Sequence, residues 1–296
     1  MNTTEVRTET PRRRRKRTPF ICTVFRRIVK NHTALIGLII FAIMILTAVF
    51  APLIAPYDPL AMDYSAVKQP PSAAHPFGTD AIGRDLLTRC IYGARYSLIL
   101  GFSSAIIGVA CGLIFGTLIG YAGGEIDMIF MRLCDVFTSL PGNLISILLS
   151  NTLGEGFIQT VLAMSIGGIP RQIRGVRAMC LKEREQEYLE AARAINCSRS
   201  KIMFKHMLPN IVSPSIVSMT MGIGNTILGA SALSYIGLGV RPPTAEWGAL
   251  LSAGKSDILT CPYLLIFPGL CIAITVLATN MFGDGLRDAL DPRLKD

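Results

Sequence analysis

The sequence "EYLEAARAINCSRSKIMFKHMLPN", residues 187–210, is a charged passage between long apolar segments. A helix over 181–195 would have one apolar face and would carry acidic and basic side chains over the remaining surface. The apolar positions of that face are Leu181, Tyr188, Ala192 and Ile195. Such a helix lies at an aqueous surface, because its charged side chains are too costly to bury in lipid. We therefore expect a partner in water to bury the apolar stripe.

A sharp turn and a second helix are expected after this first helix. Asn196 stands where the first helix should end, and asparagine tolerates the left-handed backbone of that position. Ser198 is a typical N-cap, so the second helix is expected over 199–208, ending before Pro209. The passage is thus predicted to be a helical hairpin that is too regular for a simple linker.

The composition of the whole chain is that of a membrane protein. Of its 296 residues, 51% are hydrophobic and 17% are charged, and its net charge is +9. A soluble domain carries about a quarter charged residues. The eight cysteines form no C-x-x-C pair and lie mostly in or beside apolar runs. They are interpreted as small buried hydrophobes, and neither a disulfide framework nor a metal site is expected.

Six apolar segments are candidate membrane spans, since about 20 residues are needed to cross the hydrocarbon core. They cover 34–55, 98–120, 130–150, 157–170, 212–236 and 260–283. The fourth is short, and it either ends near 170 or continues into the charged passage as one helix. The first is too long for a cleaved signal peptide and is followed by further spans. The predicted fold class is an all-α integral membrane protein with six transmembrane helices.

Lysine and arginine predict how these spans are oriented. The first 33 residues hold ten of them, 171–209 holds nine and 285–296 holds three, against four in 57–96 and two in 237–258. Both termini and the charged passage are therefore expected in the cytoplasm. The run "RRRRKR" at 12–17 is interpreted as a topology signal that touches anionic membrane lipid, rather than as a nucleic-acid site.

The second span carries a small residue at every fourth position. These residues are Ser104, Gly108, Gly112, Gly116 and Gly120. Four residues slightly exceed one helical turn, so they form a slowly winding stripe that lets another helix approach closely. We expect the stripe to be a packing face; whether it also slides during a conformational cycle stays open.

Charged residues near the third span predict an ion-paired latch. Arg132 and Asp135 are three residues apart on one helical face, and Asp127 can join them only if the chain bends. Charges in this position should face protein or water rather than lipid. The alternative is an element of a transport pathway.

The opening passage closely resembles the E-A-A loop of bacterial ABC-type importer permeases. Glu190, Ala191 and Ala192 match the start of that motif, and Leu208 with Pro209 matches its close. Two positions depart from the pattern. His206 stands at a usually apolar position, and Asn196 replaces a glycine.

Further motifs narrow the resemblance to the dipeptide/oligopeptide/nickel branch, and within it to the C-type permease subunit. They are "HPFGTDAIGRDLLTRCIYGARYSLILG" (75–101), "RPPTAEWGALL" (241–251) and "GDGLRDALDPRLKD" (283–296). The likeness covers roughly 34–296. It implies a type I ABC permease fold with a cytoplasmic coupling helix, in the cytoplasmic membrane of a prokaryote.

The resemblance also implies how the chain is divided. A basic cytoplasmic arm occupies 1–33, and the first span with its extracytoplasmic segment occupies 34–97. The transmembrane type-1 domain is expected over 98–284, with its E-A-A loop at 181–210, and a cytoplasmic tail over 285–296.

The implied partners are a second related permease, two ATPase subunits and an extracytoplasmic solute-binding protein. The sequence contains no G-x-x-x-x-G-K-[ST] motif to cradle nucleotide phosphates. ATP and magnesium are therefore expected on the partner subunits, with no cofactor or metal in this chain. The chain is read as a transport subunit and not as an enzyme.

The resemblance assigns roles to particular residues. Glu190, Ala191 and Ala192 form the docking core for the ATPase, Asn196 sets the turn, and Pro209 restarts the chain toward the fifth span. In the extracytoplasmic segment, Asp80, Arg84 and Asp85 either form a local ion-pair cluster or contact the binding protein. Trp247 in the last external loop is interpreted as an interfacial anchor or a gate element.

The leading function is import of di- or oligopeptides. A nickel or other small-solute permease of the same branch is the nearest alternative, and the absence of a His-rich tract in the spans disfavours nickel only mildly. A stand-alone secondary transporter or channel is a different class, and it predicts transport without ATPase subunits. An intramembrane enzyme is a third class, but no nucleophile–base pair stands out.

Overall fold

The computed structural model describes residues 20–290, and its regular elements are helices, which confirms the all-α class. The α-helices are α1 (Phe20–Lys30), α2 (His32–Val49), α3 (Ala51–Ile54), α4 (Leu86–Cys111), α5 (Thr117–Ala122), α6 (Gly124–Thr138), α7 (Gly142–Leu153), α8 (Phe157–Arg184), α9 (Glu187–Ala194), α10 (Arg199–Lys201), α11 (Leu208–Tyr235), α12 (Trp247–Gly254) and α13 (Tyr263–Leu290). The short segments η1 (Tyr64–Ala66) and η4 (Lys255–Asp257) are 3-10 helices, whereas η2 (Gly112–Gly116) and η3 (Ile202–Met207) are π-helical. The basic run at 12–17 and the end of the tail, 291–296, lie outside the described residues.

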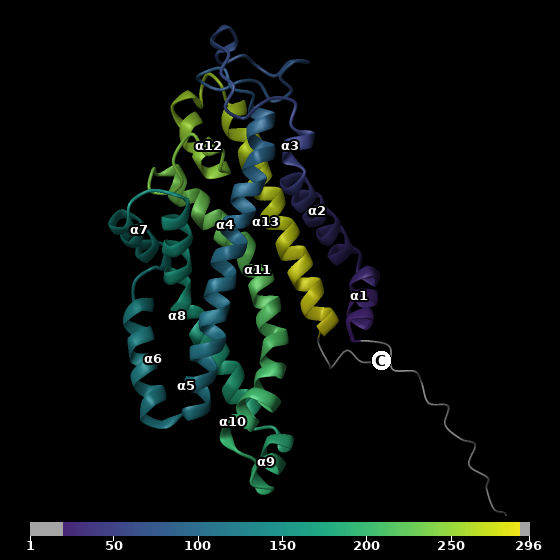
Figure 1. Cartoon of the computed structure of the whole chain (residues 1–296), viewed down its shortest axis with the longest axis vertical. Coiled ribbons are helices and arrows are strands. Elements are labelled where there is room, and N and C mark those ends of the chain that lie inside the picture. The colour runs from purple at the N-terminus through teal and green to yellow at the C-terminus, as the bar shows by residue number, and fades with distance from the viewer. Residues whose placement is uncertain (1–19, 291–296) are drawn as a thin grey trace, which may run out of the picture.

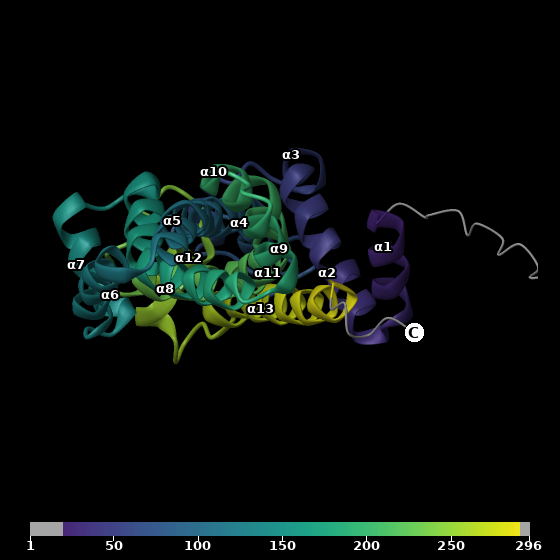
Figure 2. The ribbon, with the colours of Figure 1, turned by 90° about the horizontal axis from the view of Figure 1, so that it is seen from below.

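The helices form an elongated bundle with two distinct ends. The segment between α3 and α4 lies with α12 at one end, while α9 and α10 lie at the other and extend past the end of α13 (Figure 1). Viewed along the bundle, α6 and α7 lie on one side and α1 on the opposite side, with α4, α8 and α11 between them (Figure 2). We call the two ends the α12 end and the α9 end.

Within residues 20–290, four helical stretches are long and apolar enough to cross a membrane. They are His32–Val49, Leu86–Ala122, Arg199–Tyr235 and Tyr263–Leu290. The bent pair α6 and α7 would make a fifth. Helix α8 is long enough, at 28 residues, and it continues from the fourth predicted span into the charged passage. It is not apolar enough to count among these spans, because its second half carries basic residues, among them Arg171 and Arg174.

The third predicted span, 130–150, falls on two helices rather than on one continuous helix. Helices α6 and α7 are bent by 80° at the break between Thr138 and Gly142. Proline explains the break, because Pro141 has no backbone N–H and disfavours helical geometry at Leu140. Pro141 has extended backbone angles and precedes the first turn of α7.

Pro209 does not end a helix, contrary to expectation. The chain stays helical from Arg199 to Tyr235, and Pro209 lies in the first turn of α11. A proline in this position removes one hydrogen-bond donor and crowds the carbonyl four residues earlier. The π-helical segment η3 immediately before it changes the hydrogen-bond spacing and so accommodates the proline.

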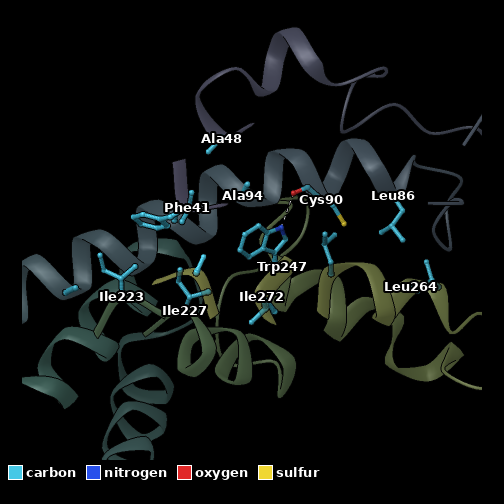
Figure 3. Packing of buried hydrophobic residues seen from close by; sticks show 14 of the residues in the cluster. Phe41, Ala48, Leu86, Cys90, Ala94, Ile223, Ile227, Trp247, Leu264 and Ile272 are labelled. Carbon is cyan, nitrogen blue, oxygen red and sulfur yellow. Dashed lines mark hydrogen bonds between the residues drawn. The ribbon is translucent and has the colours of Figure 1, made fainter. Parts of the chain in front are cut away.

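The largest apolar core lies at the α12 end and is centred on Trp247 (Figure 3). Trp247 is fully buried, and its Nε1 donates a hydrogen bond of 2.9 Å to the Cys90 carbonyl. Glu246, 1% exposed, caps α12 by accepting from the backbone N–H groups of Gly248 and Ala249, each at 2.9 Å. Trp247 is therefore a core residue rather than an interfacial anchor.

Candidate functional site

The charged passage begins with two helices where the sequence predicted one. Helix α8 ends at Arg184, the backbone is extended at Gln186, and α9 starts at Glu187. This break gives α9 its own helical register, so Leu189 is buried while Ile195 is 80% exposed. The predicted apolar stripe over 181–195 is therefore wrong.

The turn after α9 has the left-handed residue expected from the sequence. Asn196 has φ 58°. Its N–H donates to the Arg193 carbonyl at 2.9 Å, and the Cys197 N–H donates to the Ala192 carbonyl at 3.0 Å. These two bonds form a Schellman motif, which satisfies the last carbonyls of the helix. Ser198 has the extended backbone of an N-cap, although its side chain makes no capping hydrogen bond.

A small apolar cluster joins this hairpin to the membrane helices. Its buried members are Val176, Cys180, Leu189, Ala192, Ile202, Met207 and Ile211. They come from α8, α9, η3 and α11. Helix α9 is therefore packed densely against α8 and α11.

A polar network joins three of these four elements, α8, α9 and α11. Tyr188 of α9 donates to the Glu183 carboxylate of α8, and the Asn210 amide of α11 donates to Glu183 at 3.0 Å and to the Tyr188 oxygen at 2.8 Å. Burial and the neighbouring Glu183 carboxylate raise the pKa of Tyr188 to about 12, so its hydroxyl stays protonated. The sequence reasoning missed this network, since Asn210 is 27 residues from Glu183 along the chain and joins it only when α11 packs beside α8 and α9.

The three residues of the predicted docking core differ in exposure. Glu190 and Ala191 are exposed, whereas Ala192 is buried in the apolar cluster. Glu190 lines a recess of about 420 Å³ together with Arg184, Glu185 and Arg193. Sequence reasoning also missed the exposed Ile195, which lies beside these residues at the end of α9.

The stripe of small residues lies against α8. A Cβ atom added to Gly112 would lie 2.9 Å from the Cβ of Gln172, and one added to Gly116 would lie 2.8 Å from the Ile173 carbonyl oxygen. Gly120 is similarly close to Cys180, whereas Gly108 leaves 3.7 Å to its nearest neighbour. The helices approach most closely over the half of the stripe that is nearer the α9 end.

The predicted pair of Arg132 and Asp135 is present at 3.9 Å, with Arg132 mostly exposed. Asp127 does not join that pair and accepts from the Arg177 Nε at 2.6 Å, and Asp135 also pairs with Arg174 at 2.7 Å. The two aspartates of α6 therefore pair with arginines of α8. The i, i+3 spacing of Arg174 and Arg177 was the missed signal.

Comparison with known proteins shows the family to which this chain belongs. A family described as "Binding-protein-dependent transport system inner membrane component" matches residues 112–296. The chain belongs to this family of ABC permeases. A second family, "N-terminal TM domain of oligopeptide transport permease C", matches residues 21–71 and agrees with the C-type subunit. The chain is thus a multi-pass inner-membrane transport subunit and not an enzyme.

Curated relatives cover almost the whole permease. The "Glutathione transport system permease protein GsiD" of Escherichia coli O6:K15:H31 is 42% identical over 272 residues, which are 92% of this chain and 90% of the relative. The protein of the same name from Shigella boydii serotype 4 has the same identity and coverage. That of Pectobacterium atrosepticum is 41% identical with the same coverage.

The predicted polar cluster at the α12 end, Asp80, Arg84 and Asp85, makes its contacts with residues of the permease itself. Asp80 accepts from the Arg84 Nε at 2.7 Å, and Asp85 caps α4 and lies 3.0 Å from the His75 Nδ1. Arg84 is 8% exposed and Asp85 is 4% exposed. These intrachain partners favour the local ion-pair reading and leave little of the side chains for another protein.

No metal centre is assembled among residues 20–290 of the permease. Within them, no group of three or more histidine, cysteine, aspartate or glutamate side chains is arranged to hold an ion. The cysteines from Cys90 to Cys271 are free thiols in or beside the helix contacts.

Proposed function

We propose that this permease moves di- or oligopeptides across the cytoplasmic membrane, driven by separate ATPase subunits that grip the α9 hairpin. Peptide transport is supported by the match to the oligopeptide permease C family and by relatives named for glutathione, which is a tripeptide. The solute would be delivered by an extracytoplasmic binding protein, as the family description indicates.

The observation that carries the coupling role is the exposed outer face of α9. This short helix lies at the far end of the bundle, and it presents Glu190, Ala191 and Ile195 to the surroundings (Figure 1). Ala191 permits close approach of another chain, Ile195 offers apolar area, and Glu190 can pair with a basic group. A helix with buried anchors and an exposed apolar tip fits a docking element better than a solvated loop.

Force applied to α9 has a direct route to the membrane helices. Leu189 and Ala192 pack against residues of α8 and α11, and the Glu183–Tyr188–Asn210 network bridges the same elements. We propose that closure of the ATPase pair moves α9, and that α8 and α11 then move together.

A six-span topology, with both termini and α9 in the cytoplasm, is part of this proposal. The spans would be α2, α4 with α5, the bent pair α6–α7, α8, α10 with α11, and α13. The arginines of α8 that pair with Asp127 and Asp135 lower the cost of placing α8 among the spans. The permease would work as a heterodimer with a second related subunit.

Co-purification of the complex tests the proposal. We expect Ile195→Glu and Glu190→Lys to reduce recovery of the ATPase subunits with the tagged permease and to abolish ATP-driven peptide uptake. Leu259→Glu is the matched control, because Leu259 is 94% exposed at the α12 end. Full ATPase recovery and normal uptake in both α9 variants would overturn the docking assignment.

A further inference from the structure

A groove of about 730 Å³ lies beside the hairpin and borders the recess that contains Glu190. It is formed by the end of α5, the end of α8 and the turn between α9 and α10. Leu118 and Tyr121 come from α5, and Arg184, Arg193 and Arg199 come from the other elements. The groove thus joins the last turn of a membrane span to the hairpin.

The groove is strongly basic. Three arginines line it, and no carboxylate does so. Among the described residues none of the three forms a salt bridge, although Arg184 and Arg193 also border the recess that contains Glu185 and Glu190. Three unneutralised guanidinium groups repel one another, so an anion between them would be favoured.

Backbone contacts hold two of these side chains in place. Arg184 donates to the Gly120 carbonyl at 3.3 Å, and Arg193 donates to the Arg184 carbonyl at 3.3 Å. Each of these bonds uses a single terminal N–H group, so the remaining donors are free to bind an anion. The planar guanidinium matches phosphate oxygens well, because two of its N–H groups can bind one phosphate.

The other wall of the groove is continuous with an apolar membrane surface. Leu118 lies one turn before the end of the span Leu86–Ala122 and is exposed. Ile114 and Phe115, one turn earlier, are also exposed. A ligand that has a phosphate and an acyl chain would place the phosphate among the arginines and the chain along this surface.

We propose that the groove binds the headgroup phosphate of an anionic phospholipid from the adjacent leaflet. The lipid would neutralise Arg184, Arg193 and Arg199 together and would hold the α9–α10 turn against the end of α5. The hairpin would then be stiffer in an anionic membrane than in a zwitterionic one. This assignment does not depend on which solute is transported.

Spin-labelled lipids in nanodiscs test the site on the assembled transporter. The immobilised fraction of labelled phosphatidylglycerol is compared with that of labelled phosphatidylcholine, for the wild type and for the triple variant Arg184→Gln/Arg193→Gln/Arg199→Gln. We expect the wild type to prefer phosphatidylglycerol and the triple variant to lose the preference. Each arginine removed should lower the affinity for phosphatidylglycerol relative to phosphatidylcholine by roughly fivefold. Arg199→Gln alone serves as a mild variant, with an expected partial loss.

A matched control removes three other charges at the same end, in Lys182→Gln/Lys205→Gln/Arg287→Gln, and should keep the preference. An unchanged preference in the triple variant would overturn the proposal, as would an equal loss in the control. Displacement of the lipid signal by millimolar inorganic phosphate would show a free-anion site instead. A triple variant that keeps its lipid preference and loses the ATPase subunits would assign the groove to a protein contact.

Discussion

Asn196 shows how one residue fixes the shape of the hairpin. Its left-handed backbone closes α9 through two hydrogen bonds and turns the chain toward α10. The related E-A-A pattern has glycine at this position, and both residues reach positive φ at low cost. The departure from the pattern therefore preserves the geometry of the turn.

The effect of a substitution at Asn196 on stability should depend on how easily the new residue adopts positive φ, and not on the polarity of its side chain. We expect Asn196→Gly to leave stability and uptake close to the wild type. Asn196→Val should destabilise the hairpin by about 1–2 kcal/mol, because a β-branched residue disfavours φ near 58°. Hydrogen exchange of the α9 amides in the reconstituted transporter measures the difference; equal protection in the two variants would contradict this reading.

At the scale of elements, the contact between the glycine stripe and α8 sets how the second span packs. The stripe is not uniform, since Gly116 has a backbone oxygen of α8 where a Cβ would lie, whereas Gly108 has room. The two glycines are on the same helix and eight residues apart, so they offer a comparison within one stripe.

Alanine substitution should separate these two positions. Gly116→Ala should destabilise the permease by about 1–3 kcal/mol through overpacking. Gly108→Ala should be neutral or stabilising by up to about 1 kcal/mol, because alanine favours the helix. The measurement is thermal unfolding of the purified transporter, monitored by the labelling of buried cysteine thiols as they become exposed. A larger loss for Gly108→Ala would mean that the stripe packs differently.

Local chemistry made several elements predictable from sequence. The apolar runs predicted the long helices, and Asn196 predicted the turn after α9, because both features depend on neighbouring residues only. Pro141 marks the place where α6 and α7 separate, because proline has no backbone N–H and disfavours helical geometry at the residue before it. The break before α9 was missed, since no proline or glycine marks residues 185–186.

Contacts between distant segments were not predictable in the same way. The sequence predicted that Asp135 pairs with Arg132 and that Asp127 joins them only at a bend, but Arg174 and Arg177 become partners of these aspartates only when α8 packs against α6. Trp247 was placed at a surface because it follows two prolines in a loop, whereas tertiary packing buries it against α4 and α13. One sequence carries no direct signal for such long-range pairs.

In the whole molecule, the α12 end and the α9 end differ in how they are held. Packing around Trp247 and the ion pairs near Asp80 secure the α12 end, while the hairpin at the α9 end is tied to α8 and α11. Under the proposed function, this arrangement lets a movement of α9 tilt the spans about the firmly packed end.

A photo-crosslinker placed at Ile195 in the assembled transporter tests the central claim most directly. Ile195 is exposed at the end of α9 and makes no contribution to the apolar cores. We expect a crosslinked product between the permease and an ATPase subunit, with a yield that changes when ATP binds. A crosslink to lipid or to the extracytoplasmic binding protein alone, or none that depends on the ATPase subunits, would contradict it.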